Sequence, residues 1–173
     1  MTILVIGCSL NPESNSQILA RQAVREIQTL GADCRLIDLR DQRLSFCDGA
    51  TVDDLVGPLA QAVRDADGIV MAVPIYNYDV NAAAKNVVEH VSKAFEGKLV
   101  AFLCAAGGQG SYMSIMSLAN SLMLDFRCFI VPRFVYAVWS DFGDDGTIKN
   151  EKVATRLKQL CEEVVRIGKA LKG

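Results

Sequence analysis

The sequence predicts an α/β domain in which helices cover both faces of a parallel β-sheet. Short apolar runs alternate with longer segments whose apolar residues recur every three or four positions, the pattern of strands alternating with helices. The short runs are apolar almost throughout, as expected of strands that are covered on both faces. The chain has 173 residues, of which 51% are hydrophobic, and this suits one well-packed domain spanning 1–173.

Five strands and five helices are expected along the chain. The strand-like runs are 3–7, 34–39, 68–73, 99–105 and 128–131. The helices follow from apolar stripes at helical spacing, which begin with Leu19, Leu55, Ala84, Ile115 and Val153. Right-handed crossovers leave two common arrangements of five parallel strands, and we expect the flavodoxin-like order 2-1-3-4-5, a three-layer α/β sandwich. That order places a ligand crevice at the carboxyl ends of the first and third strands.

Charge and cysteine content exclude several classes of partner. Lys plus Arg number 18 against 20 Asp plus Glu, a net charge of -2, so the chain lacks the basic surface that nucleic-acid binding requires. Six cysteines without a C-x-x-C pair and a single histidine predict no metal site, and their apolar surroundings indicate reduced thiols. No apolar stretch is long enough to span a bilayer. We therefore expect a soluble, cytoplasmic protein without a nucleic-acid or membrane partner.

The loop after the first strand is dense in short polar side chains. These are Ser9, Asn11, Ser14, Asn15 and Ser16. They stand beside the free N–H groups at the start of a helix, where the helix dipole favours an anion such as a phosphate. The alternative is that Ser14 or Asn15 simply caps the helix. The loop contains neither G-K-[ST] nor G-x-G-x-x-G, so a phosphate here would depend on neutral donors.

The loop after the third strand combines apolar and aromatic side chains with an amide. It runs through Pro74, Ile75, Tyr76 and Asn77. Such a set can form a wall for a flat ligand, while backbone N–H groups around Asn77 donate to ring heteroatoms. A plain turn with surface tyrosines is the alternative.

The loop after the fourth strand is rich in glycine. Gly107, Gly108 and Gly110 allow the backbone to pass close to a ligand or to adopt φ > 0, although a flexible turn is the alternative. Because the carboxyl ends of parallel strands meet at one edge of a sheet, the three loops are expected to converge there. A phosphorylated, planar aromatic ligand is the simplest occupant of such a site.

With these loops the chain resembles the NADPH-dependent FMN reductase family over nearly its whole length. The matches are Gly7, Ser9-Leu10, Ser14 to Ser16, the P-x-Y-N element at 74–77, Lys85-Asn86 and the Gly107-Gly108 loop. The resemblance implies FMN as cofactor, with its phosphate held by the polar side chains of the first loop. It also implies an isoalloxazine ring against 74–77, with Gly107 and Gly108 near the pyrimidine edge. The chain departs from the family pattern at Asn11, where an arginine is usual, and at Ile75, where a glutamate is usual.

The resemblance implies an NAD(P)H-dependent FMN reductase-type oxidoreductase. Hydride would pass from NAD(P)H, the co-substrate, to FMN and on to a flavin, quinone, azo or metal-oxyanion acceptor. No acid–base side chain is obligatory, and Asn77, Gly107 and Gly108 are expected to support the ring. A homodimer or homotetramer is also implied, which agrees with the extra apolar residues Met113 and Met116 near the fourth helix.

Two other functions stay open at this point. One is an FMN-binding electron carrier of the flavodoxin type, which the nearly neutral charge disfavours because such carriers are strongly acidic. The other is a non-catalytic flavodoxin-like protein, which the missing arginine allows. Trp139 and the aromatic residues around it form either a lid or a partner-subunit wall for the flavin, or they pack in the core or in a subunit interface. His90 is interpreted as a packed or interfacial residue rather than a catalytic one.

Overall fold

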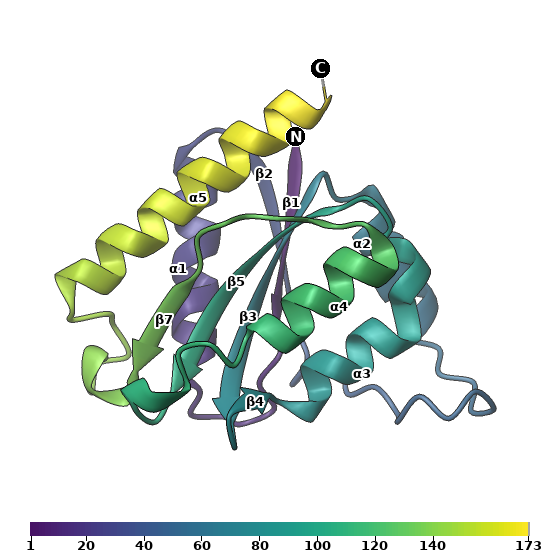
Figure 1. Cartoon of the computed structure of the whole chain (residues 1–173), viewed down its shortest axis with the longest axis horizontal. Helices are drawn as coiled ribbons and strands as arrows, with labels where there is room; N and C mark the ends of the chain where they lie inside the picture. The colour runs from purple at the N-terminus through teal and green to yellow at the C-terminus, as the bar shows by residue number, and fades with distance from the viewer. Residues whose placement is uncertain (173) are drawn as a thin grey trace.

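A parallel sheet lies at the centre of the computed structural model, which describes residues 1–172 (Figure 1). The strands are β1 (Thr2–Gly7), β2 (Asp33–Asp38), β3 (Gly68–Tyr76), β4 (Asp79–Val80), β5 (Leu99–Ala106), β6 (Phe129–Ile130) and β7 (Val135–Val138). The helices are α1 (Asn15–Thr29), α2 (Val56–Asp65), α3 (Ala82–Val91), α4 (Met116–Phe126) and α5 (Glu151–Lys172), with short 3-10 turns η1 (Ser92–Phe95), η2 (Gln109–Ser111) and η3 (Trp139–Asp141).

The sheet has the order β2-β1-β3-β5-β6, with these neighbours parallel. This is the order 2-1-3-4-5 of the five expected strands, so the flavodoxin-like prediction is confirmed. Two strands were not predicted. β4 is a two-residue strand that pairs antiparallel with the end of β3. β7 pairs with the second half of β5, whereas β6 pairs with Leu99 and Val100 at its start, so β6 and β7 are two pieces of one edge position.

The interruption between β6 and β7 has a local cause. Pro132 lies between them, has no N–H to donate and has a fixed φ, so a regular strand does not run through it. The expected strand at 128–131 is therefore short, and its continuation begins at Val135.

Two separate hydrophobic cores cover the two faces of the sheet. α2, α3 and α4 pack on one face through residues such as Val63, Val87 and Leu122. α1 and α5 pack on the other face through residues such as Leu19 and Leu160 (Figure 1). The five apolar stripes therefore form five helices, as predicted, and together with the sheet they make three layers.

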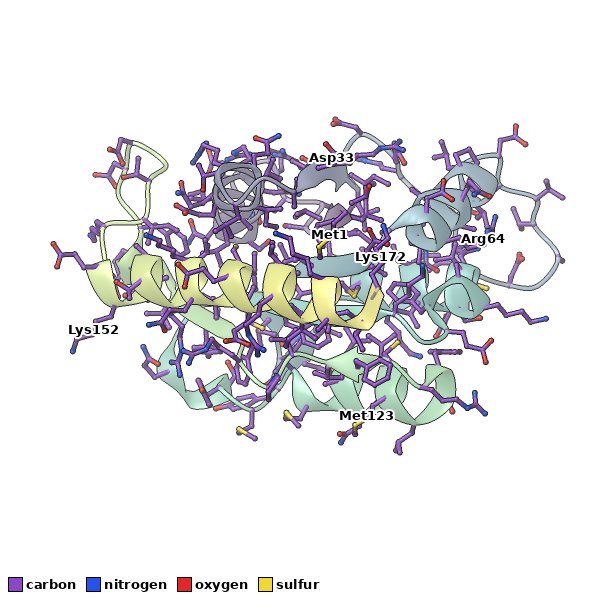
Figure 2. The ribbon with its side chains drawn as sticks, turned by 90° about the horizontal axis from the view of Figure 1, so that it is seen from above. Met1, Asp33, Arg64, Met123, Lys152 and Lys172 are labelled. Atoms are coloured by element: carbon purple, nitrogen blue, oxygen red, sulfur yellow. The ribbon has the colours of Figure 1, made fainter. Side chains whose placement is uncertain are left out.

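The end of α5 lies against the start of β1, at the edge of the sheet opposite the carboxyl ends (Figure 2). A Cβ on Gly168 would overlap the end of the Met1 side chain, so a larger residue here would require the Met1 side chain to move. Asp67 joins the two segments, because its carboxylate accepts the Thr2 N–H at 2.8 Å and the Lys172 ammonium at 2.9 Å. These contacts hold the amino edge of the sheet and leave the opposite edge to the loops.

The six cysteines are free thiols. Cys8, Cys104, Cys128 and Cys161 are buried, and burial raises the pKa of Cys161 to about 12. Burial also raises the pKa of the half-exposed Cys34 to about 11. Such thiols stay protonated and weakly reactive at neutral pH, which fits the reduced thiols expected from the sequence. Within residues 1–172, no helix is long and apolar enough to cross a membrane, and His, Cys, Asp and Glu side chains form no group of three suited to a metal ion.

Candidate functional site

A cavity of about 600 Å³ lies where the loops after β1, β3, β5 and β7 meet, at the lower edge of the sheet in Figure 1. This volume is within the range of small-molecule sites, roughly 300–1,000 Å³. The lining residues are Asn11, Glu13, Ser14, Asn15, Ser16, Pro74, Ile75, Tyr76, Asn77, Ala105, Ala106, Gly107 and Trp139. Nine of the eleven predicted site residues thus line one cavity. Ser9 and Gly108 lie outside this lining.

The start of α1 presents unused hydrogen-bond donors to the cavity. Ser14 occupies the N-cap position but makes no side-chain bond to the helix, and its hydroxyl instead bonds the Ser16 hydroxyl at 2.9 Å. The first turn contains no acidic residue. Ser14 therefore occupies the N-cap without capping the helix through its side chain. The Gln17 N–H bonds the Ser14 carbonyl at 3.1 Å, so the N–H groups of Asn15 and Ser16 are the ones available to an anion.

Two hydrogen bonds within the loop set the shape of the first loop. Ser9 is fully buried, and its hydroxyl accepts the Asn11 N–H at 3.2 Å. The Asn11 side-chain oxygen in turn accepts the Glu13 N–H at 3.0 Å. Ser9 therefore supports the loop from beneath, whereas Asn11 lies at the cavity surface.

Arg40 brings a positive charge to this loop, although no basic residue lines the cavity. Its guanidinium donates to the Pro12 carbonyl at 3.0 Å and forms a bidentate pair with the Asp38 carboxylate. Gln17, from α1, also donates to Asp38 at 2.9 Å. Partial burial opposes ionisation of Asp38, but the hydrogen bonds and charge of Arg40 outweigh it and hold the pKa of Asp38 below its ordinary value. Arg40 thereby fastens the first loop to the end of β2, a role that the sequence did not indicate.

The loop after β3 is a tight hairpin into β4. Ile75 pairs with Val80, and Tyr76 with Asp79, so the two residues between them form the turn. These residues, Asn77 and Tyr78, have φ of 51° and 63°, the left-handed region that a two-residue hairpin turn requires. The turn alternative was thus correct about the backbone, but the turn carries Tyr76 and Asn77 into the cavity lining.

The same hairpin is tied to the end of β1. The Asn81 side chain, at the N-cap of α3, donates to the Cys8 carbonyl at 2.8 Å. This bond holds the loops after β1 and β3 in a fixed relation, so that both reach the same cavity.

The glycine loop after β5 is held from below by Tyr136 of β7. The Tyr136 hydroxyl donates to the Gly108 carbonyl at 2.5 Å and bonds the Ser111 hydroxyl at 2.7 Å. Gly107 and Gly108 do not have positive φ, so a left-handed backbone is not the reason for glycine at these two positions. Nothing lies within 4 Å of a Cβ built on either residue. The two glycines therefore leave the backbone exposed beside open space, as close approach of a ligand requires.

The Lys85-Asn86 match lies outside the cavity lining and has a different task. The Asn86 side chain hydrogen-bonds to the backbone of the loop before α2. Its amide nitrogen donates to the Ser45 carbonyl at 2.8 Å, and its oxygen accepts the Cys47 N–H at 3.0 Å. His90 donates to the same Ser45 carbonyl at 2.8 Å. Asn86 and His90 are thus packing residues that hold this loop on α3, as interpreted for His90.

Trp139 enters the cavity lining from the turn after β7. The sequence left four roles open: a lid or a partner-subunit wall for the flavin, core packing, and interface packing. Its side chain is 69% exposed, which excludes core packing within this chain. Its position could be recognised only after β7, which is four residues long, had been located.

Neutral donors at a helix start, an apolar and aromatic wall and exposed glycine backbone fit a phosphorylated, planar aromatic molecule such as FMN. The fold is a flavodoxin-like α/β sandwich, and its cavity lies at the sheet edge where folds of this class place a ligand. Three comparisons identify the family within this class.

Residues 1–142 match the family of NADPH-dependent FMN reductases. The NAD(P)H-dependent FAD/FMN reductase of Geobacillus thermodenitrificans is 29% identical over 161 residues, which cover 90% of this chain and 87% of that protein. The FMN-dependent NADH:quinone oxidoreductase of Bordetella parapertussis is 28% identical over 142 residues, or 62% of this chain and 68% of that protein. Among solved structures, the NAD(P)H:(acceptor) oxidoreductase FerB of Paracoccus denitrificans superposes with a TM-score of 0.79 at 19% identity, covering 98% of this chain and 97% of that one.

The chain belongs to the NADPH-dependent FMN reductase family, and it is an oxidoreductase. The resemblance inferred from the loops is therefore confirmed. FMN and NAD(P)H are the cofactors of this family, as predicted.

Proposed function

We propose that this protein holds FMN in the cavity and passes electrons from NAD(P)H to a small planar acceptor such as a quinone or a free flavin. One observation carries the proposal: a single cavity joins open N–H donors of α1 to an apolar and aromatic wall and to exposed glycine backbone. The donor set matches the phosphate end of FMN, and the wall matches its ring. Azo compounds and metal oxyanions are the other acceptors that belong to the proposal.

The phosphate would be held by the start of α1. Asn11, Ser14, Asn15 and Ser16 line this end of the cavity, and Ser9 supports the loop that carries them. Neutral hydroxyl and amide donors, with the positive end of the α1 dipole, can bind a phosphate without a lysine. Arg40 supports the loop from behind through its bond to the Pro12 carbonyl, and its charge is balanced by Asp38.

The ring would lie between the hairpin after β3 and the glycine loop. Pro74 and Ile75 supply apolar surface, while Tyr76 and Asn77 line the outer part of the cavity. Backbone N–H groups of Gly107 and Gly108 are proposed to donate to the edge of the ring where negative charge grows on reduction. When bound, FMN supplies the hydride acceptance and electron transfer. The protein then has to bind, orient and stabilise charge, and no acid–base side chain is required.

A homo-oligomer, either a homodimer or a homotetramer, also belongs to the proposal. Near and along α4, the side chains of Met113, Met116, Met123 and Leu124 are between 37% and 74% exposed, and Met123 lies on the outer side of the helix (Figure 2). An exposed apolar surface of this kind is commonly covered by another subunit in a homo-oligomer. Light scattering tests this part, since a monomeric mass at micromolar concentration contradicts it. The cytoplasm, where the six thiols stay reduced, is the proposed location.

The proposal is tested by the spectrum of the purified protein after incubation with FMN. Flavin absorbance that co-elutes with the protein and bleaches on anaerobic addition of NADPH or NADH is the expected result. Bound flavin that stays oxidised with both nucleotides indicates an electron carrier instead. A protein that retains no flavin contradicts both functions and leaves the non-catalytic alternative.

A further inference from the structure

Trp139 has no part in the proposed binding of FMN, although it lines the same cavity. It is the single tryptophan of the chain, and its side chain is 69% exposed. An indole has a large apolar area, and one that is mostly exposed to water contributes little to the stability of the fold. At the rim of a cavity, such a side chain is well suited to contact a ligand.

The turn that carries Trp139 is held by a buried carboxylate. Asp141 is 8% exposed, and its side chain accepts the Val138 N–H at 2.7 Å and the Asn150 amide at 2.6 Å. The Asp141 carbonyl accepts a further N–H from Lys149 at 2.9 Å. These bonds fix both ends of η3 and join it to the start of α5. Because the turn is already ordered, a ligand that contacts Trp139 loses little affinity to ordering the backbone.

The position of Trp139 in the sheet separates it from the surfaces assigned to FMN. The phosphate donors follow β1, and the ring surfaces follow β3 and β5, whereas Trp139 follows β7 at the edge of the sheet. It therefore stands one strand beyond the glycine loop. A molecule that reacts with the ring from the open side of the cavity would meet the indole there.

The chemistry of the indole restricts what it can recognise. Trp139 presents a flat, uncharged π-face, and the cavity lining contains Glu13 but no Lys or Arg. Such a surface favours a planar aromatic ring, including the cationic pyridinium of an oxidised nicotinamide. It offers no charge to an oxyanion.

We propose that Trp139 is a specificity-determining residue that stacks on the planar aromatic ring of the reactant exchanging electrons with FMN. This inference rests on the proposed function, because it takes the cavity as the FMN site. Two molecules carry the required ring, the nicotinamide of NAD(P)H and an aromatic acceptor such as a quinone. The experiment below has one arm for each.

The test compares Trp139→Leu, which removes the aromatic face, with the conservative Trp139→Phe. Phe129→Leu is the matched control, because Phe129 is a 54% exposed aromatic on β6, outside the cavity lining. Each FMN-loaded protein is titrated with NADP⁺ and, separately, with the quinone menadione, and binding is followed by the change in flavin absorbance. Neither titration requires turnover. The Kd for FMN and the KM for ferricyanide, an acceptor without an aromatic ring, are measured in parallel.

Trp139→Leu should raise the Kd of the ring ligand about tenfold, as expected on removal of a stacking partner. Trp139→Phe should restore most of the affinity, and Phe129→Leu should leave it unchanged. The Kd for FMN and the KM for ferricyanide should stay within about twofold of the unmodified protein. Weaker binding of NADP⁺ alone identifies the nicotinamide nucleotide as the stacked ligand, and weaker binding of menadione alone identifies the acceptor. Either result supports the inference.

Three outcomes overturn the inference. The first is that each ring ligand binds Trp139→Leu as tightly as it binds the unmodified protein, or that neither ring ligand binds to either protein. The second is that Trp139→Leu weakens FMN itself, which would assign the indole to the cofactor. The third is a protein that binds no FMN, which removes the site as well. A protein that binds FMN but is not bleached by NADPH or NADH contradicts only the proposed function, because the two titrations still decide the role of Trp139.

Discussion

Replacing Arg40 with glutamine should loosen the first loop and lower the stability of the FMN-free protein. The substitution removes a bidentate pair with Asp38 and the hydrogen bond to the Pro12 carbonyl. The side chains of the pair are only 26% and 12% exposed, so screening by water is incomplete. Hydrogen bonds to charged groups contribute about 1.5–3 kcal/mol, and because the pair is close to the surface we expect a loss of about 1.5 kcal/mol in the free energy of unfolding.

The loss should depend on pH, and its sign follows from Asp38. The pKa of this carboxyl is lower in the folded protein than its ordinary value of 3.8, because the hydrogen bonds and charge of Arg40 outweigh the effect of burial. The ionised pair therefore stabilises the fold at pH values above 3.8, and this contribution is lost as the pH falls through the folded pKa. The difference in unfolding free energy between the two proteins should be largest near neutral pH and should shrink in acid.

Urea denaturation of the FMN-free proteins between neutral pH and pH 3 measures this difference, and an FMN titration measures the effect on the loop. We expect FMN to bind Arg40→Gln several-fold more weakly, roughly 1 kcal/mol, because the loop is less ordered before binding. Arg43→Gln is the control, since it removes the same charge from an exposed position three residues further on. Equal effects of the two substitutions, or a stability difference that does not change with pH, would refute the reasoning.

Three further predictions concern the loops. Ser14→Ala combined with Asn15→Ala should weaken FMN binding while the FMN-free protein keeps its thermal midpoint, because Ser14 does not cap α1; a matching loss of stability in calorimetry would contradict this. Tyr78→Gly should raise the free energy of unfolding by roughly 0.5–1 kcal/mol, measured in urea, because glycine relieves the left-handed φ of 63° at the cost of a more flexible unfolded chain. Asn86→Ala should expose the segment around Ser45 to limited proteolysis, whereas Lys85→Ala, on the solvent side of α3, should not; equal cleavage of the two variants would count against this role of Asn86.

The parts of the molecule set by local pattern could be predicted from the sequence. Apolar runs and stripes located the five helices and the main strands, because burial on both faces leaves little choice of pattern. The sheet order followed from right-handed crossovers. The loops after β1, β3 and β5 could then be assigned to one edge by topology alone. The residues gathered there, from Asn11 to Gly107, line one cavity.

Features that depend on distant partners could not be predicted. The bond between Arg40 and Pro12 joins residues 28 positions apart, and that between Asn86 and Ser45 joins residues 41 apart. Neither pair has a local pattern. β7 was missed because its four residues are too few to show a periodic pattern. Without β7, the position of Trp139 could not be predicted. The sequence also gave no sign that Tyr136 would hold the glycine loop through Gly108.

The two hydrogen bonds from Asn86 to the loop before α2 determine which residues of that loop can be substituted. Both of its bonds go to main-chain atoms, the carbonyl of Ser45 and the N–H of Cys47. The side chains at these positions take no part in those two bonds, so many residue types are compatible with the attachment. Leu44 and Phe46 alternate with them and lie beside Leu10 of the first loop, in a small hollow of about 130 Å³. This segment is therefore a place where the surface next to the proposed FMN site can be redesigned while the anchoring amide is kept.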